Sequence, residues 1–269
     1  MKDIADTVKI GITGAAGRMG RRIAALALEA DGKFEIAGAF ETSTSPDLGS
    51  DIGELAGKGA CGTKVSVDIQ DKPHVVIDFS TTEGTLHWLD VCRSQKIAMV
   101  IGTTGLTDSQ LSTISEASSD IPIVHAANMS VGVNLLLRVV AQVARALGED
   151  YDIEISETHH RFKKDAPSGT AIALARSICA ATGKDYGDVA QLGRGGMCPR
   201  KAGEIGMHAL RIGDTVGEHT VHFGNLGETI TIGHSAHTRD TFVRGALRAA
   251  AWLTGKKPGL YSMLDVLGL

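Results

Sequence analysis

The chain has 269 residues, a length typical of one or two domains, and its 27 Lys and Arg against 31 Asp and Glu give a net charge of −4. With 43% hydrophobic and 22% charged residues, it lacks the composition of a disordered chain, a collagen-like repeat or a strongly basic nucleic-acid-binding protein. Glycine is unusually frequent at 33 residues, whereas aromatic residues make up only 4%.

The sequence predicts a cytoplasmic protein. Its four cysteines are widely spaced and include no C-x-x-C pair, which indicates free thiols in a reducing compartment rather than disulfides or a zinc site. The first nine residues include Asp3 and Asp6, whereas a signal peptide would be basic and then apolar. No run of 18 or more apolar residues is found, so we expect no membrane span.

Strands and helices alternate in the first half of the chain. Val8–Thr13 is expected to be a strand, Arg18–Ala30 a helix and Phe34–Phe40 a second strand, which together make a βαβ unit. The expected strands are apolar on both faces, as is typical of a parallel sheet covered by helices on both sides. Later strands are expected at His74–Phe79, Ala98–Gly102 and Ile121–His125, and helices at Glu83–Ser94 and Ser109–Ser118. Glu41–Gly62 is expected to be a long loop with room for a short helix.

The pattern changes after about Val131. A long helix is expected at Asn134–Leu147, followed by a strand at Tyr151–Glu157, whose strict alternation indicates one solvent-exposed face. We expect an open sheet here, mixed or antiparallel. Its other strands are expected at Met207–Ile212, Glu218–Phe223 and Glu228–Gly233, the last two in a hairpin through Gly224–Gly227, with helices at Ala171–Ala181 and Thr241–Leu253.

A glycine-rich loop, Gly14-Ala15-Ala16-Gly17-Arg18-Met19-Gly20, separates the first strand from the first helix. Glycines there let the backbone approach a pyrophosphate, which the N–H groups and positive dipole of the helix start can bind. Glu41 ends the second strand, where dinucleotide folds place an acid that accepts hydrogen bonds from the adenosine ribose. The spacing is G-x-x-G-x-x-G, so a tight turn with close helix packing is the alternative.

Two further strand ends carry small or polar residues. Gly102-Thr103-Thr104 follows the fourth expected strand, and Ala126-Ala127-Asn128-Met129 follows the fifth. Ligands of open α/β sheets bind at the carboxyl ends of strands, so both segments are placed to line a nicotinamide pocket. Each could equally be an ordinary turn.

The densest polar group is Glu157–Thr170, between an expected strand and an expected helix. Ser168, Gly169 and Thr170 occupy the helix start, where exposed N–H groups can bind a carboxylate. One of His159 and His160 could act as a general acid, and Lys163 could pair with an acidic substrate or donate a proton. The alternative is a solvated basic loop. Consecutive histidines point to opposite faces of a strand, so no metal site is expected.

These motifs resemble the dihydrodipicolinate reductase family, also called 4-hydroxy-tetrahydrodipicolinate reductase, of bacterial lysine and diaminopimelate synthesis. The resemblance spans nearly the whole chain and is most specific in the string His-His-x-x-Lys-x-Asp-x-Pro-Ser-Gly-Thr. It implies hydride transfer from NADH or NADPH to a cyclic dicarboxylate, with His159 as the proton donor and Lys163 as a second donor. Substrate would contact His160, Ser168, Gly169 and Thr170, and cofactor would contact Gly14–Met19, Glu41, Gly102–Thr104 and Ala126–Met129.

The resemblance also implies an α/β fold in two domains. Residues 1–130 and 241–269 would form a Rossmann-like dinucleotide-binding domain, and residues 131–240 an α+β domain with an open mixed sheet for substrate binding and assembly into a homotetramer. Many family members carry an arginine directly after the ribose-binding acid, but here Thr42 follows Glu41. We therefore expect NADH to be preferred, or both cofactors to be used.

Two other functions fit parts of the pattern. A two-domain dehydrogenase acting on an aldehyde or sugar would need a cysteine nucleophile, or a Lys/His pair without the carboxylate-binding turn. A redox-sensing protein that binds a dinucleotide without turnover would have no use for His159 and Lys163 beside an anion-binding turn.

Overall fold

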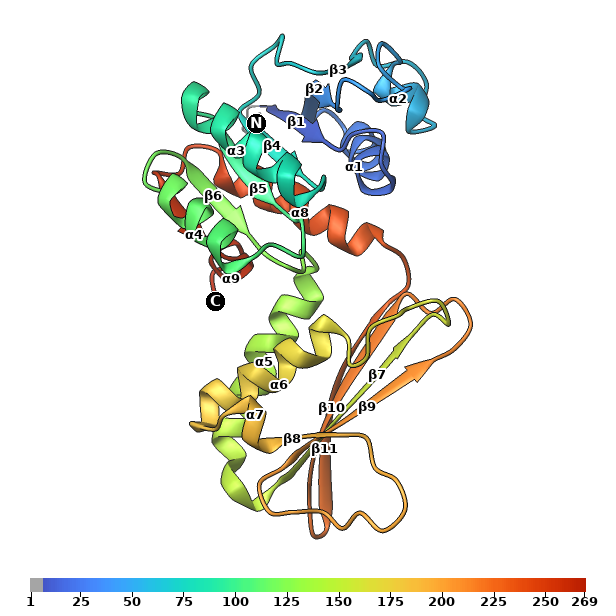
Figure 1. The fold of residues 1–269 in the computed structure, drawn as a ribbon, viewed down its shortest axis with the longest axis vertical. Coiled ribbons are helices and arrows are strands. Elements are labelled where there is room, and N and C mark those ends of the chain that lie inside the picture. The colour runs from blue at the N-terminus through green and yellow to red at the C-terminus, as the bar shows by residue number, and fades with distance from the viewer. Residues whose placement is uncertain (1–6) are drawn as a thin grey trace, which may run out of the picture. The chain divides into compact units, whose positions relative to one another are not determined.

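The computed structural model in Figure 1 describes residues 7–269. The chain divides into two compact units, one comprising the residues up to Ser130 together with Asp240–Leu269, the other comprising Val131–Arg239. Each unit has its own sheet.

The first unit is built on a seven-stranded parallel sheet in the order β12-β6-β5-β4-β1-β2-β3. The strand order reverses at β1 and β4, which is the doubly wound arrangement of Rossmann-like domains. All four residues of β4 and of β5 are buried, because helices cover both faces. The strands are β1 (Val8–Thr13), β2 (Phe34–Phe40), β3 (Val65–Ser66), β4 (Val75–Asp78), β5 (Ala98–Ile101), β6 (Pro122–His125) and β12 (Gly259–Tyr261).

Helices from both ends of the chain pack on this sheet. α8 lies beside α1 and contacts β1, β4, β5 and β6, whereas α3 and α4 pack together over another core cluster. Arg22 of α1 donates two hydrogen bonds of 2.6 Å to Asp240 at the start of α8. A Cβ on Gly245 would lie 1.7 Å from the Met129 carbonyl oxygen, so only glycine lets α8 come this close to the Met129 backbone. The helices are α1 (Arg18–Leu28), α2 (Ile52–Leu55), α3 (Thr82–Gln95), α4 (Asp108–Ala117), α8 (Asp240–Leu253) and α9 (Met263–Leu267).

The second unit contains a five-stranded mixed sheet in the order β11-β10-β7-β9-β8 (Figure 1). β11, β10 and β7 are antiparallel, and β7, β9 and β8 are parallel. Helices α5 and α6 pack on one face, over a core that includes Ile155, Met207 and Phe223. The elements are α5 (Val131–Leu147), β7 (Asp152–His159), α6 (Gly169–Thr182), α7 (Tyr186–Val189), β8 (Ala190–Leu192), β9 (Ile205–Arg211), β10 (Gly217–Asn225) and β11 (Glu228–Ala236), with a 3₁₀ turn at Gly148–Asp150.

The predicted fold class is confirmed: a Rossmann-like α/β sheet with a second, mixed sheet. The predicted hairpin forms, with Asn225 opposite Glu228 in the β10–β11 ladder. β3, β8 and β12 were not predicted, because strands of two or three residues are too short to show a periodicity. β7 is longer than predicted, and its final residue is His159.

One long apolar helix stands out in the second unit. The helical segment Val131–Asp150 has a window of mean hydropathy 1.4 and is long and apolar enough to cross a membrane. A search for an unbroken apolar run misses it, because polar residues such as Arg138 interrupt the sequence. Leu136, Val140 and Ala144 on this helix pack in the core of the second unit, as in the core helix of a globular domain.

Candidate active site

Two glycines of the loop, Gly14 and Gly20, are required by close backbone packing. Gly14 has a φ of +62°, and a Cβ there would lie 2.9 Å from the Phe79 carbonyl oxygen. A Cβ on Gly20 would lie 2.2 Å from the Gly14 carbonyl oxygen. Gly17 is the N-cap of α1 and has no side chain with which to cap the helix. The N–H groups at this helix start are therefore available to an anion.

Glu41 lies against this loop. Its Oε1 accepts a hydrogen bond of 2.8 Å from the Ala16 N–H, while Arg21 Nε donates to the Ala16 carbonyl at 2.6 Å. Ala16 is thus held through both its N–H and its carbonyl group. Thr42, next in the chain, is exposed, and its hydroxyl lies 3.2 Å from that of Thr44. Glu41, at the end of the second strand, is thus in direct contact with the glycine loop.

A buried carboxylate that the sequence analysis missed joins the strand ends of the first unit. Asp78, at the end of β4, is fully buried and accepts hydrogen bonds from the hydroxyls of Thr13, Ser80, Thr85 and Thr103, at 2.5, 2.5, 2.6 and 2.8 Å. Its Oδ1 also accepts from the Ser80 N–H at 3.3 Å. These bonds connect the ends of β1, β4 and β5 to the first turn of α3. The sequence signal that could have revealed Asp78 was an acidic residue at the end of an apolar strand.

The two predicted nicotinamide-lining segments follow β5 and β6. Gly102 is buried, and a Cβ there would lie 2.3 Å from the Phe79 ring, whereas Thr104 is exposed. The Ala126 N–H donates to the Ile101 carbonyl at 3.2 Å, so this segment continues alongside β5. Ala127 is exposed, Asn128 is half-buried and accepts from the Ser130 N–H, and Met129 is buried. Both segments lie at the same carboxyl edge of the sheet as the glycine loop.

In the second unit a single carboxylate organises the polar cluster. Glu157 is 1% exposed and lies 2.6 Å from His159 Nδ1. Arg211 donates to both Glu157 oxygens, each at 2.8 Å, and the Ser168 N–H donates to Oε1 at 3.0 Å. Burial raises the pKa of Glu157, but the bonds from Arg211 and His159 outweigh burial and leave this pKa below its ordinary value. Glu157 is therefore an anion that joins β7, β9 and the start of α6.

His159 is half-enclosed by charged and aromatic neighbours. Burial lowers its pKa, the Glu157 carboxylate raises it, and the Lys163 and Arg211 cations lower it further, with a net decrease below the ordinary value. The ring lies edge-on to His219, with centroids 5.1 Å apart. A Cβ on Gly217 would lie 3.0 Å from His159 Nε2, so a larger residue at this position would crowd the imidazole.

The remaining predicted residues line the start of α6 and the preceding loop. Ser168 caps the helix by accepting from the Ala171 N–H at 3.2 Å. Gly169 is exposed, and a Cβ there would meet no atom of residues 7–269 within 4 Å. Lys163 Nζ lies 2.8 Å from Asp165. His160 Nδ1 is buried without a hydrogen-bond partner in the described chain, and Thr170 is half-buried on the first turn. The structure thus collects His159, Lys163 and the helix start in one unit.

Two of the four cysteines are unsuited to act as nucleophiles. Burial raises the pKa of the Cys92 and Cys179 thiols, which suppresses the reactive thiolate. All four cysteines are free. Among residues 7–269, no three His, Cys, Asp or Glu side chains are grouped as metal ligands.

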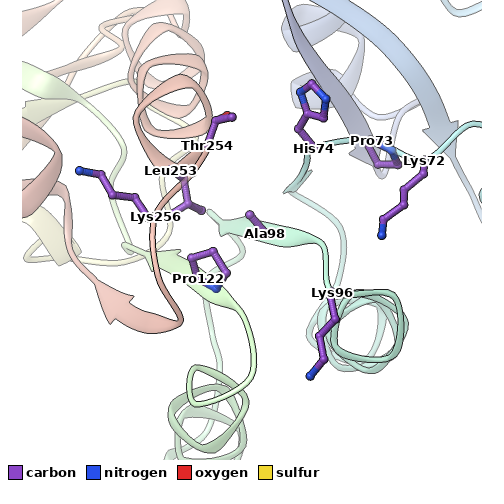
Figure 2. A pocket seen from close by; sticks show the side chains of 10 residues that line it. Lys72, Pro73, His74, Lys96, Ala98, Pro122, Leu253, Thr254 and Lys256 are labelled. Atoms are coloured by element: carbon purple, nitrogen blue, oxygen red, sulfur yellow. The ribbon is translucent and has the colours of Figure 1, made fainter.

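A hollow of about 390 Å³ lies at the opposite edge of the first sheet, where β4, β5 and β6 begin (Figure 2). Lysines surround it, but Lys96 and Lys256 point away from its middle in Figure 2. Lys96 pairs with Asp120 at 3.4 Å, and the Lys256 ammonium lies 4.1 Å from the centre of the Trp252 ring. Two of the lysines that could converge on a ligand are therefore engaged elsewhere.

Two family models cover almost the entire chain. The model "Dihydrodipicolinate reductase, N-terminus" matches residues 8–129, and "Dihydrodipicolinate reductase, C-terminus" matches residues 132–267. The chain belongs to the dihydrodipicolinate reductase family. The C-terminal model runs on to residue 267, although Asp240–Leu269 folds with the first unit.

Family relatives match over their full length. A 4-hydroxy-tetrahydrodipicolinate reductase from Geotalea uraniireducens is 49% identical over 266 residues, covering 97% of this chain and 99% of the relative. One from Rubrobacter xylanophilus is 48% identical over 260 residues, covering 97% and 98%. A dipicolinate-bound dihydrodipicolinate reductase from Paenisporosarcina sp. TG-14 has the same fold, with a TM-score of 0.76, 22% identity and coverage of 96% and 98%.

His219 gives this member of the dihydrodipicolinate reductase family a testable pH dependence. It is 4% exposed, its Nε2 lies 2.9 Å from Ser168 Oγ, and burial lowers its pKa to about 4. Between pH 6.5 and 4 the unfolded chain binds a proton at this histidine that the folded chain does not. The free energy of unfolding should therefore decrease as the pH falls through this window, by on the order of 3 kcal/mol.

Chemical denaturation of the wild type and a His219→Gln variant at several pH values measures this effect. The wild type should lose more stability than the variant between pH 6.5 and 4. Equal losses would show that His219 is not the group responsible.

Proposed function

We propose that the chain is an NAD(P)H-dependent 4-hydroxy-tetrahydrodipicolinate reductase of lysine and diaminopimelate biosynthesis. Its full-length match to relatives of that name supports this activity. The observation that carries the proposal is the group formed by His159, Lys163 and the start of α6, which combines a candidate proton donor with an anion-binding helix start. A dinucleotide sensor would need neither.

The proposed cofactor site lies at the carboxyl edge of the first sheet. The start of α1, at Gly17–Met19, would bind the pyrophosphate, because its N–H groups and dipole favour an anion. Glu41 would accept hydrogen bonds from the ribose, and the nicotinamide would lie beside Gly102–Thr104 and Ala126–Met129. When bound, the dinucleotide supplies a hydride.

The proposed substrate is a cyclic dicarboxylate. One carboxylate would bind at Gly169 and Thr170, where the open space around the Gly169 Cα lets a ligand approach the backbone. The Lys163 ammonium would pair with the substrate's negative charge, and the unpartnered His160 Nδ1 would find a partner there. A related reductase was solved with dipicolinate bound, which agrees with this choice of substrate.

The proton required by the reaction would come from the second unit. One hydride and one proton together reduce one ring double bond, and the hydride leaves negative charge that an acid must neutralise. His159 donates this proton, and Lys163 provides a second ammonium donor nearby. Because the pKa of free His159 lies below its ordinary value, a dianionic substrate would favour the protonated imidazole when it binds.

The paired variant His159→Gln, Lys163→Ala tests these roles. Loss of the proton donors should reduce kcat by about 10²- to 10⁴-fold, because proton transfer contributes that much in typical enzymes. The affinity for NADH should remain within about twofold of wild type, since both residues belong to the second unit. The assay follows NADH absorbance with freshly made substrate. Full activity in the paired variant would contradict the mechanism.

Cofactor preference is the second test. Glu41 would repel a 2′-phosphate, and Thr42 and Thr44 offer only hydroxyls beside it. We therefore expect kcat/KM for NADH to equal or exceed that for NADPH. Thr42→Arg should raise kcat/KM for NADPH by about tenfold, because an arginine can bind the phosphate through two hydrogen bonds. A wild-type enzyme that strongly prefers NADPH would refute this assignment.

We also propose that the second unit mediates assembly into a homotetramer in the cytoplasm. On the face of its sheet away from α5 and α6, Leu210 of β9 is 50% exposed, as a residue at a subunit contact would be in a single chain. Four free cysteines fit a reducing compartment. Analytical ultracentrifugation should give the mass of four chains, and a monomer at micromolar concentration would exclude this assembly.

A further inference from the structure

We propose that Glu157, held by Arg211, is a positioning residue that sets the hydrogen-bonding form of His159 and fixes it relative to the substrate-binding helix start. This inference rests on the proposed function and adds a residue to its machinery. The carboxylate reaches both halves of the site, His159 Nδ1 at 2.6 Å and the Ser168 N–H at 3.0 Å. One rigid group therefore determines the distance between the proton donor and the anion-binding turn.

The contact determines which nitrogen faces the substrate. An ionised carboxylate only accepts hydrogen bonds, so His159 Nδ1 must carry a proton toward Glu157. Nε2 is then the nitrogen that exchanges a proton with the substrate. When His159 is protonated, the resulting imidazolium is stabilised by the same carboxylate.

Arg211 keeps this carboxylate ionised and in place. It contacts both Glu157 oxygens in a paired geometry, and its Nη2 also donates to the Asp165 carbonyl. A buried carboxylate without such partners would be strongly destabilising or would take up a proton. The arginine thus also joins the Lys163–Asp165 loop to the carboxylate that holds His159.

The titratable and charged groups around His159 come from four elements. They are Glu157 on β7, Arg211 on β9, His219 on β10, and Lys163 with Asp165 on the loop before α6. His234 on β11 lies beyond His219. Glu157 is the contact that favours protonation of His159, whereas burial, Lys163 and Arg211 oppose it. Removing the Glu157 charge should therefore shift the titration of His159 to lower pH.

Glu157→Gln tests the proposal in the full-length enzyme. We expect kcat to fall by about 10- to 10³-fold with NADH affinity unchanged, because the amide cannot stabilise the imidazolium. Activity requires protonated His159, so kcat/KM should decrease as pH rises through its pKa, and this decrease should begin at lower pH in the variant. Unchanged kcat and an unchanged pH profile would overturn the proposal, as would an equal loss of NADH affinity.

The same strand provides a matched control. Glu154 also lies 2.6 Å from a histidine nitrogen, His208 Nε2, and it pairs with Arg194 and Arg200. Because side chains alternate along a strand and Glu154 is three residues from Glu157, the two carboxylates lie on opposite faces of the sheet. Glu154→Gln should leave the pH profile of kcat/KM at its wild-type position. If both variants shifted the profile equally, the effect would be general destabilisation of β7.

A measurement without turnover separates this proposal from the proposed function. The ¹⁵N shifts of His159 should report a proton on Nδ1 in wild type above its pKa, and loss of that preference in Glu157→Gln. A wild-type chain without reductase activity would refute the proposed function alone. A wild-type His159 with its neutral proton on Nε2 would refute the role of Glu157 regardless of activity.

Discussion

The second unit depends on the need to compensate one buried negative charge. Moving a carboxylate out of water is so costly that every lone pair must find a donor, and around Glu157 the donors are an arginine, an imidazole and a backbone N–H. These donors belong to β9, β7 and the start of α6. Satisfying the carboxylate therefore brings together the chain segments that make up the proposed substrate site.

The first unit stabilises a buried carboxylate of its own with different hydrogen-bond donors. Asp78 is equally buried at the end of a central strand, but four hydroxyls and an N–H surround it in place of a cation. Hydroxyl donors supply hydrogen bonds but no opposite charge. At Glu157, Arg211 supplies an opposite charge as well as two hydrogen bonds, and the carboxylate still favours protonation of His159.

Sequence patterns predicted much of the fold and only part of each site. Apolar runs predicted β1, β2 and β4 to β6, and the string around His159 and Ser168 predicted the strand, loop and helix that hold them. Asp78 was missed because its hydroxyl partners are spread from Thr13 to Thr103, and such contacts have no local signature. Glu157 carried a usable signal: it shares the parity of Ile153 and Ile155, so strict alternation would have placed it on the covered face. Arg211 lies 54 residues further on, and only strand pairing brings it near.

The hydrogen bond from the Thr103 hydroxyl to Asp78 limits how Thr103 can bind another molecule. A hydroxyl has a single proton, and Thr103 donates it to Asp78 at 2.8 Å. Its oxygen can then meet another group only through its lone pairs. An amide N–H could donate to that oxygen, whereas a carbonyl oxygen presented to it would find no proton. A buried acid would thus select the orientation of a group bound beside Thr103, without touching that group itself.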